Sequence, residues 1–188
     1  RQSERLDLYK KHALELVEKG MAYYCFCSAE RLENMRKLQE AAKKAPMYDR
    51  KCLGLTKEEV EEKIAAGEPY VIRLKVPRDG TTEFDDLIRG RVSFENSVID
   101  DQVLIKSDGF PTYHMACVVD DHYMKISHVI RAEEWISSTP KHIILYEAFG
   151  WTPPKFAHAP MVLAPDRSKL SKRHGATGVK EFRELGYL

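Results

Sequence analysis

The chain has 188 residues, of which 43% are hydrophobic and 31% charged, so it is long enough for a sizeable core and has the composition of a globular protein. Its formal net charge is +1, which excludes a protein that binds nucleic acid through overall charge and leaves only local basic patches. No apolar run reaches the roughly 18 residues of a membrane span, and no signal peptide opens the sequence, so we expect a cytoplasmic protein with no membrane partner.

Four cysteines, at positions 25, 27, 52 and 117, are too few for a secreted disulfide scaffold and favour a reducing compartment. The first residue is Arg1, which enters a helical pattern at once, and the sequence stops abruptly at Leu188. We therefore expect a piece of a longer protein.

The first third of the chain predicts three helices and a short strand. Apolar residues at helical spacing predict a helix that ends at Gly20, and the aromatic stretch 21–26 predicts a short strand or a turn. Ser28 can cap a second helix, and Thr56 starts a third helix with capping-box spacing. Residues 31–51 hold seven Lys or Arg against three acids, which is either a solvated helix face or a surface for phosphates.

The middle of the chain predicts strands. Residues 70–76 alternate, which puts Ile72, Leu74 and Val76 on a buried face and Arg73 and Lys75 on the other side. Further short strands are predicted at 91–94 and 102–106. Asp79-Gly80 marks a turn, and Asp108-Gly109 is the strongest hairpin signal.

The last third predicts an α/β layer. Residues 115–119 form a small apolar run, and strands are predicted at 127–130 and 161–163. Thr139 as N-cap, followed by Pro140 at the first helical position, predicts a helix that ends at Gly150. A last helix is predicted over 179–185.

A basic loop precedes that last helix. The stretch 167–173 contains four cations and two serines and no acid. It is either a solvated loop or a cradle for an anion with several oxygens, such as a triphosphate.

Four segments in this order resemble the glutamyl-tRNA synthetases of bacterial and organellar type. They are Arg1-Gln2-Ser3-Glu4-Arg5-Leu6, the block from Asp108-Gly109-Phe110-Pro111-Thr112-Tyr113-His114 to Val118-Val119-Asp120-Asp121-His122, Val129-Ile130-Arg131-Ala132-Glu133-Glu134-Trp135, and Lys169-Leu170-Ser171-Lys172-Arg173. The last is similar to the class I lysine loop. The resemblance covers essentially the whole chain.

The resemblance implies an α/β fold: part of a class I Rossmann-type catalytic domain with an α+β connective insertion. The expected division is 1–20 for the end of the first Rossmann half and 21–111 for the insertion that contacts the tRNA acceptor end. Residues 112–165 would form the second Rossmann half, and 166–188 the lysine loop and the start of a stem-contact region.

The implied activity is ATP-dependent glutamate–tRNA ligation. Glutamate attacks the α-phosphate of ATP with Mg²⁺, and the glutamyl group passes to the 3′ end of tRNA(Glu). Such chemistry depends on positioning and charge stabilisation. The implied partners are tRNA(Glu), L-glutamate and ATP, and we expect a monomer.

The family's pattern assigns roles to individual residues. Lys169 and Lys172 are the expected catalytic residues, and the expected ATP-binding residues are Lys169, Ser171, Lys172 and Arg173. Glutamate would be bound by Tyr113, Cys117 and Arg131. The arginine would form a planar fork to the substrate carboxylate, unless it pairs instead with Glu133 or Glu134.

Other residues near this predicted pocket receive no catalytic role. Some family members carry asparagine at the position of Cys117, which we expect to be a small packed residue and not a nucleophile. His114 and His122 are expected to be hydrogen-bonded structural residues.

A second predicted site combines Cys25, Cys27, Tyr48 and Cys52. Thiolates are good zinc ligands, and some relatives carry zinc here, with tyrosine in the fourth position in some of them. Two readings stay open, a structural Zn²⁺ site and three buried free cysteines.

The family's histidine-rich ATP motif is not found, because no H-x-G-H or H-x-G-T sequence occurs. We therefore predict that this chain alone does not catalyse adenylation at a useful rate. The alternatives are a glutamyl-Q tRNA(Asp) synthetase-type paralogue and a non-catalytic RNA-binding module.

Overall fold

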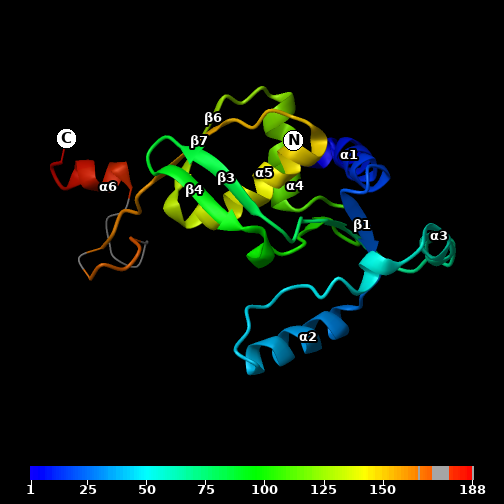
Figure 1. The fold of residues 1–188 in the computed structure, drawn as a ribbon. Coiled ribbons are helices and arrows are strands. Elements are labelled where there is room, and N and C mark those ends of the chain that lie inside the picture. The colour runs from blue at the N-terminus through cyan, green and yellow to red at the C-terminus, as the bar shows by residue number, and fades with distance from the viewer. Residues whose placement is uncertain (165, 171–177, 188) are drawn as a thin grey trace.

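The structure is a computed structural model, and it describes residues 1–164, 166–170 and 178–187. The helices are α1 (Leu6–Glu18), α2 (Ala29–Ala41), α3 (Lys57–Ala65), α4 (Tyr113–Tyr123), α5 (Thr139–Phe149) and α6 (Val179–Glu184). The strands are β1 (Ala22–Cys25), β2 (Val71–Leu74), β3 (Thr81–Asp86), β4 (Gly90–Glu95), β5 (Val103–Ile105), β6 (His128–Ala132) and β7 (Lys155–Ala159). The chain is thus α/β, as expected (Figure 1).

The strands form two sheets. The smaller sheet has the order β1-β2-β5 and is antiparallel. The larger has the order β4-β3-β7-β6, in which the β3–β4 hairpin is antiparallel and β7 runs parallel to both β3 and β6. The larger sheet therefore draws strands from both sides of residue 111, where the insertion was expected to end.

The small sheet packs one face on the main core, between α1, α4 and α5. Its other face carries Tyr23 and Cys25 and is covered by the segment that contains Tyr48 and Cys52. α5 contributes apolar side chains both to the main core and to the core of the larger sheet. A helix that is apolar on more than one side is buried, as α5 is here.

Arg73 corrects the alternation predicted for residues 70–76. It was expected on the solvent side, but it is buried. Its guanidinium lies 4.1 Å from the ring centroid of Tyr48 and donates to the backbone oxygen of Asp101. The segment that covers the second face of the small sheet comes from elsewhere in the chain, so local alternation could not reveal it.

The start of α5 also differs from the prediction. Ser138 occupies the N-cap position, and Thr139 and Pro140 are the first two helical residues. The Thr139 hydroxyl instead donates to the backbone oxygen of Trp135 and lies 3.1 Å from Nε2 of His158. The predicted strand at 161–163 is also wrong, since only an isolated bridge joins Leu163 to Lys169.

A buried pair ties β3 to β7. Asp86 Oδ2 lies 2.6 Å from Nδ1 of His158, and both side chains are buried. Burial raises the pKa of Asp86, but hydrogen bonds from His158 and from backbone N–H groups bring it down to about 2. Aspartate at an inward position also explains why the sequence did not reveal β3, whose buried residues are Thr82, Phe84 and Asp86.

Candidate functional site

Arg131 lies near the carboxyl end of β6, where open α/β sheets bind ligands. Its guanidinium carbon is 5.6 Å from the ring centroid of Tyr113 and 5.3 Å from that of Trp135. Its Nη2 donates to Sγ of Cys117 over 2.9 Å. Since α4 begins at Tyr113 and places Cys117 one turn later, the fold brings all three predicted glutamate-binding residues together. Trp135 joins them, although the sequence did not single it out.

The acidic residues next to Arg131 have other partners. Glu133 pairs with Arg89, and Glu134 Oε2 lies 2.6 Å from Nζ of Lys169. Arg131 itself makes no ion pair with any residue that the structure describes. The proposed pairing of Arg131 with its acidic neighbours is therefore not what the structure contains.

Behind Arg131, Cys117 contacts the next acidic group. Its Sγ donates to Oδ2 of Asp121 over 3.4 Å. Burial raises the pKa of Cys117 and also that of Asp121, the latter against the opposing effects of Cys117 and Arg131. A thiol held in its protonated form is a poor nucleophile. The hydroxyl of Tyr146 is buried nearby and has no hydrogen-bond partner among the described residues.

The histidines close to the pocket are neutral packing groups. Nδ1 of His114 lies 2.8 Å from Nε2 of His142. Burial lowers the pKa of His114 to about 4 and that of His142 to about 3, so both rings are uncharged at neutral pH. His122 stacks on Trp151 with ring centroids 3.7 Å apart.

The structure describes residues 166–170, which include Lys169 and Leu170 of the basic loop. A cavity of about 640 Å³ is lined by both Arg131 and Lys169. Its other lining residues come from the ends of β6 and β7, from the segment after β7 and from α6. The predicted ATP-binding residues Ser171, Lys172 and Arg173 lie outside the described residues.

The structure brings the residues of the cysteine cluster together. The Sγ atoms of Cys25, Cys27 and Cys52 all lie within 4.8 Å of one another. The Tyr48 hydroxyl oxygen is 3.3 Å from Sγ of Cys25 and 3.3 Å from Sγ of Cys27, and it accepts a hydrogen bond from Cys52 N. Two sulfurs thus contact the phenol oxygen, and the third, that of Cys52, lies 3.5 Å from Sγ of Cys27.

These donors fit a tetrahedral metal ion. Zn–S bonds of about 2.3 Å place the sulfurs of a tetrahedral site about 3.8 Å apart. Although burial raises the pKa of Cys25, its hydrogen bonds with Tyr48 and Arg73 outweigh that effect, and the net shift is downward. Burial raises the pKa of Tyr48, so the phenol would have to give up its proton on binding metal.

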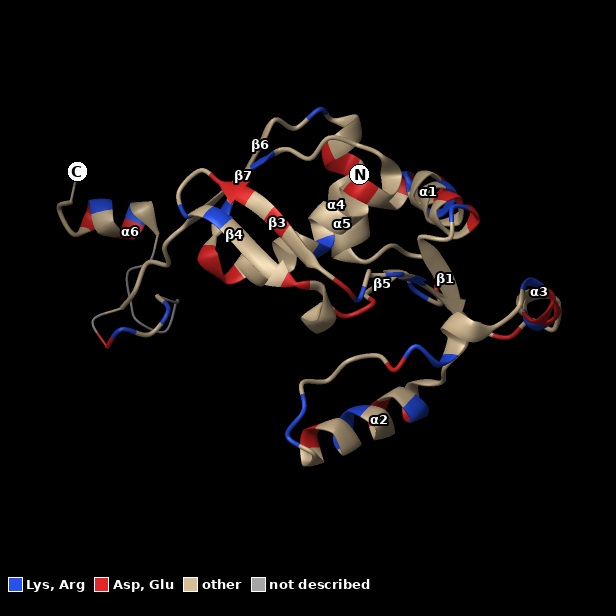
Figure 2. Ribbon diagram, viewed as in Figure 1, with Lys and Arg blue, Asp and Glu red and all other residues tan. Residues whose placement is uncertain are grey.

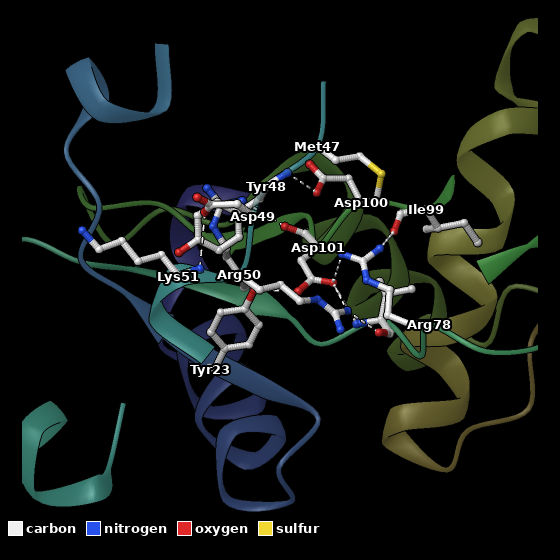
Figure 3. Close-up of polar contacts among 12 residues, drawn as sticks. Tyr23, Met47, Tyr48, Asp49, Arg50, Lys51, Arg78, Ile99, Asp100 and Asp101 are labelled. Atoms are coloured by element: carbon white, nitrogen blue, oxygen red, sulfur yellow. Dashed lines mark hydrogen bonds and ion pairs between the residues drawn. The ribbon is translucent and has the colours of Figure 1, made fainter. Parts of the chain in front are cut away.

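Two aspartates bind the short segment that carries Tyr48 and Arg50 (Figure 3). Tyr48 N donates to Oδ1 of Asp100 over 2.8 Å. Asp101 is fully buried and accepts from Nη2 of Arg50 and from the Tyr23 hydroxyl, each over 2.6 Å. The sequence did not single out either aspartate, because their partners lie about 50 residues earlier in the chain.

Residues 29–51, called here the basic arm, comprise α2 and the segment that returns from it. α2 and the first part of the returning segment extend away from both sheets, whereas the part with Tyr48 packs on the small sheet, and lysines and arginines lie along the arm (Figure 2). No residue of α2 is buried, and its Leu38 is 72% exposed. Four cations of the arm make no ion pair with any described residue: Arg36, Lys43, Lys44 and Lys51.

The two limbs of the arm are joined by side chains. The Gln39 amide donates to Met47 O and accepts from Met47 N. Arg31 pairs with Asp49. The free cations are therefore carried on a defined scaffold.

The whole chain, residues 1–188, matches the family described as tRNA synthetases class I (E and Q), catalytic domain. It is 58% identical over its full length to a glutamate–tRNA ligase of Treponema denticola and 62% identical to one of Fusobacterium nucleatum. The chain spans 37% of the length of each of these relatives.

The fold is also that of solved relatives. A crystal structure of a glutamate tRNA ligase from Elizabethkingia meningosepticum, in complex with its amino acid, matches with a TM-score of 0.87 and 43% identity. The match covers 93% of this chain and 36% of that one. Every helix that the structure describes here is too short or too polar to traverse a lipid bilayer.

Proposed function

Because this chain belongs to the catalytic-domain family of class I tRNA synthetases for glutamate and glutamine, we propose that it is part of a glutamate–tRNA ligase. The parent protein activates glutamate with ATP and transfers it to the 3′ end of tRNA(Glu). The observation that carries the proposal is the position of Arg131, which has no acidic partner among the described residues and shares a cavity with Lys169.

Arg131 binds the γ-carboxylate of glutamate in this proposal. A guanidinium offers paired N–H donors that match a carboxylate, and the flanking rings of Tyr113 and Trp135 keep its plane oriented. Cys117 lines the same subsite. None of the neighbouring histidines is needed as a base, because the α-carboxylate of glutamate is already ionised when it attacks the α-phosphate of ATP.

Lys169 binds phosphate oxygens of ATP, together with Ser171, Lys172 and Arg173 as the family resemblance implies. Lys169 must exchange Glu134 for the phosphates when ATP binds. That contact is half exposed, and exposed ion pairs contribute little, so the exchange costs little. Mg²⁺, bound with ATP, would neutralise part of the phosphate charge.

The site has an open side. Within the described residues β6 is an edge strand, and Ile130 on it is 73% exposed. We infer that the rest of the parent protein covers this edge and supplies the remaining ATP-binding groups, so the 188-residue chain does not activate glutamate by itself. The active parent acts as a monomer in the cytoplasm.

The test is ATP–pyrophosphate exchange with glutamate and tRNA. The full-length parent should show exchange that depends on glutamate, and the 188-residue chain should show none. Exchange by the 188-residue chain would contradict the inference that the rest of the parent supplies the remaining ATP-binding groups. A parent that shows no glutamate dependence would contradict the function, and glutamylation of tRNA(Asp) in place of tRNA(Glu) would indicate the paralogue.

The basic arm contacts phosphates of the tRNA acceptor end. The four unpaired cations of the arm should each release counterions on binding, so affinity should fall steeply with salt. Replacing Lys43 and Lys44 by alanine should lower the slope of log K against log salt concentration by about 2. Filter binding of tRNA to the parent measures both.

A matched control removes two exposed cations that already have partners. Lys106 pairs with Asp108 and Lys19 with Glu15, both outside the arm. The double alanine variant at these positions should keep the salt slope of the parent. An equal loss of slope in both double variants would show that the arm has no special role.

The cysteine cluster holds one structural Zn²⁺ through Cys25, Cys27, Cys52 and Tyr48. Elemental analysis of the purified parent should find about one zinc per chain, and a chelator should lower its melting temperature. Cys52→Ala should abolish binding, whereas Cys117→Ala, which lies outside the cluster, should keep it. Parent protein free of zinc, with three titratable thiols in the cluster, would support the free-cysteine reading.

A further inference from the structure

The acidic side chain of Asp121 lies behind the proposed glutamate subsite, where no role has been assigned to it. α4 carries Tyr113, Cys117 and Asp121 at intervals of four residues, so all three follow one face of the helix. Arg131 contacts the first two of these from β6. Asp121 is the third and contacts Arg131 only through the cysteine.

The three groups form a directed chain of hydrogen bonds. Arg131 Nη2 can only donate, and it does so to Sγ of Cys117 over 2.9 Å. An ionised carboxylate can only accept, and Oδ2 of Asp121 lies 3.4 Å from the same Sγ. The single thiol proton must therefore point toward Asp121, which leaves the sulfur lone pairs for Arg131.

We propose that Asp121 is a positioning residue for glutamate recognition, acting through Cys117 to hold the guanidinium of Arg131 in its substrate-binding orientation. The inference rests on the proposed function. It requires that residue 117 both accept from Arg131 and donate to Asp121. Serine meets this requirement, and alanine meets neither half of it.

Replacing Asp121 by asparagine should reverse the direction of the hydrogen bond between residue 121 and Cys117. The asparagine amide can donate to Sγ, which would turn the thiol proton toward the donors of Arg131. The guanidinium would then lose its fixed acceptor and the orientation that a carboxylate needs. The Michaelis constant for glutamate should rise about tenfold, while kcat changes little, because the reacting groups are untouched.

Asp120 provides a matched control. It is the next residue on α4, but its carboxylate faces the other way, accepting from the Tyr9 hydroxyl and pairing with Arg5. Asp120→Asn should lower the melting temperature and leave the Michaelis constant for glutamate unchanged. A purely structural role of Asp121 would give the same pattern as Asp120.

The experiment compares Asp121→Asn, Cys117→Ala, Cys117→Ser and the double variant Asp121→Asn/Cys117→Ala in the full-length parent, by glutamate-dependent ATP–pyrophosphate exchange. Both Asp121→Asn and Cys117→Ala should raise the Michaelis constant, the double variant should be no worse than either, and Cys117→Ser should recover most of what Cys117→Ala loses. Additive effects, an unchanged constant in Asp121→Asn, or a serine variant as impaired as alanine would overturn the proposal.

Two further outcomes are kept apart by the same assay. If the unmodified parent shows no glutamate-dependent exchange, the proposed function is wrong, and the positioning role of Asp121 is wrong with it. If the parent is active and Asp121→Asn behaves like the parent, only the positioning role of Asp121 is wrong. Should Asp121→Asn not fold, the cysteine pair alone decides, since serine must restore what alanine loses.

Discussion

Replacing Arg131 by alanine in the full-length parent should lower kcat/KM for glutamate about a hundredfold. Two charge-assisted hydrogen bonds to a substrate carboxylate are together worth about 3 kcal/mol, and each 1.4 kcal/mol is about a factor of ten. Arg131→Lys should restore only a small part of the loss, because an ammonium lacks the planar pair of donors. Glutamate-dependent ATP–pyrophosphate exchange is the measurement.

Arg91 offers a control with the same change of charge. It lies on β4, is well exposed and pairs with Glu83, and it does not line the cavity that Arg131 shares with Lys169. Arg91→Ala should leave kcat/KM for glutamate as it is. Equal losses in the two variants, or full activity of Arg131→Ala, would show that the γ-carboxylate is bound elsewhere.

Replacing Asp101 by asparagine should lower the free energy of unfolding by about 3 kcal/mol, because it leaves the partly buried guanidinium of Arg50 without its counter-charge. Asp101 is fully buried and also accepts from the Tyr23 hydroxyl and from Val76 N. Urea unfolding followed by circular dichroism measures the change.

The same substitution should expose the cysteine cluster. Arg50 and Tyr48 belong to one short segment, so loosening Arg50 frees the phenol that contacts the sulfurs of Cys25 and Cys27. Both thiols should then react faster with an aromatic disulfide reagent. Asp108→Asn, which alters an exposed aspartate paired with Lys106, should change neither stability nor thiol reactivity. If the Asp101→Asn protein is destabilised but its thiols react at the normal rate, Asp101 does not keep the cysteine cluster closed.

Much of the local structure could be predicted from the sequence. Ser28 and Thr56 cap their helices with the expected side-chain bonds, because a cap needs only residues within one turn. The expected strands at 21–26 and 91–94 are confirmed. The family and fold class are confirmed too, because they rest on several blocks of residues in order along the chain. The residue-by-residue roles stay predictions.

The predictions that differ from the structure have a common cause, which is contact between segments far apart in the sequence. The hairpin signal at Asp108-Gly109 forms its turn, with Gly109 at a φ of +80°, and one antiparallel bridge joins Ile105 to Pro111 across it, but α4 begins at Tyr113 in place of a full second strand. The apolar run 115–119 was not recognised as part of that helix. Only the packing of α4 on the main core shows which of its residues are inside.

The sequence by itself determined the caps at Ser28 and Thr56, the family and the identity of the cations near the cavity, since each depends on residues close together or on their order. Only the tertiary structure decided which acid meets which base. Arg131 has acids two and three residues away, yet Arg89 and Lys169, 44 and 35 residues distant from their partners, take both of them. β6 ends at Ala132, and Glu133 and Glu134 are the first residues of the 3-10 helix that follows it. The backbone therefore changes direction between Arg131 and its acidic neighbours, and each charge is satisfied by whatever other segment the fold places beside it.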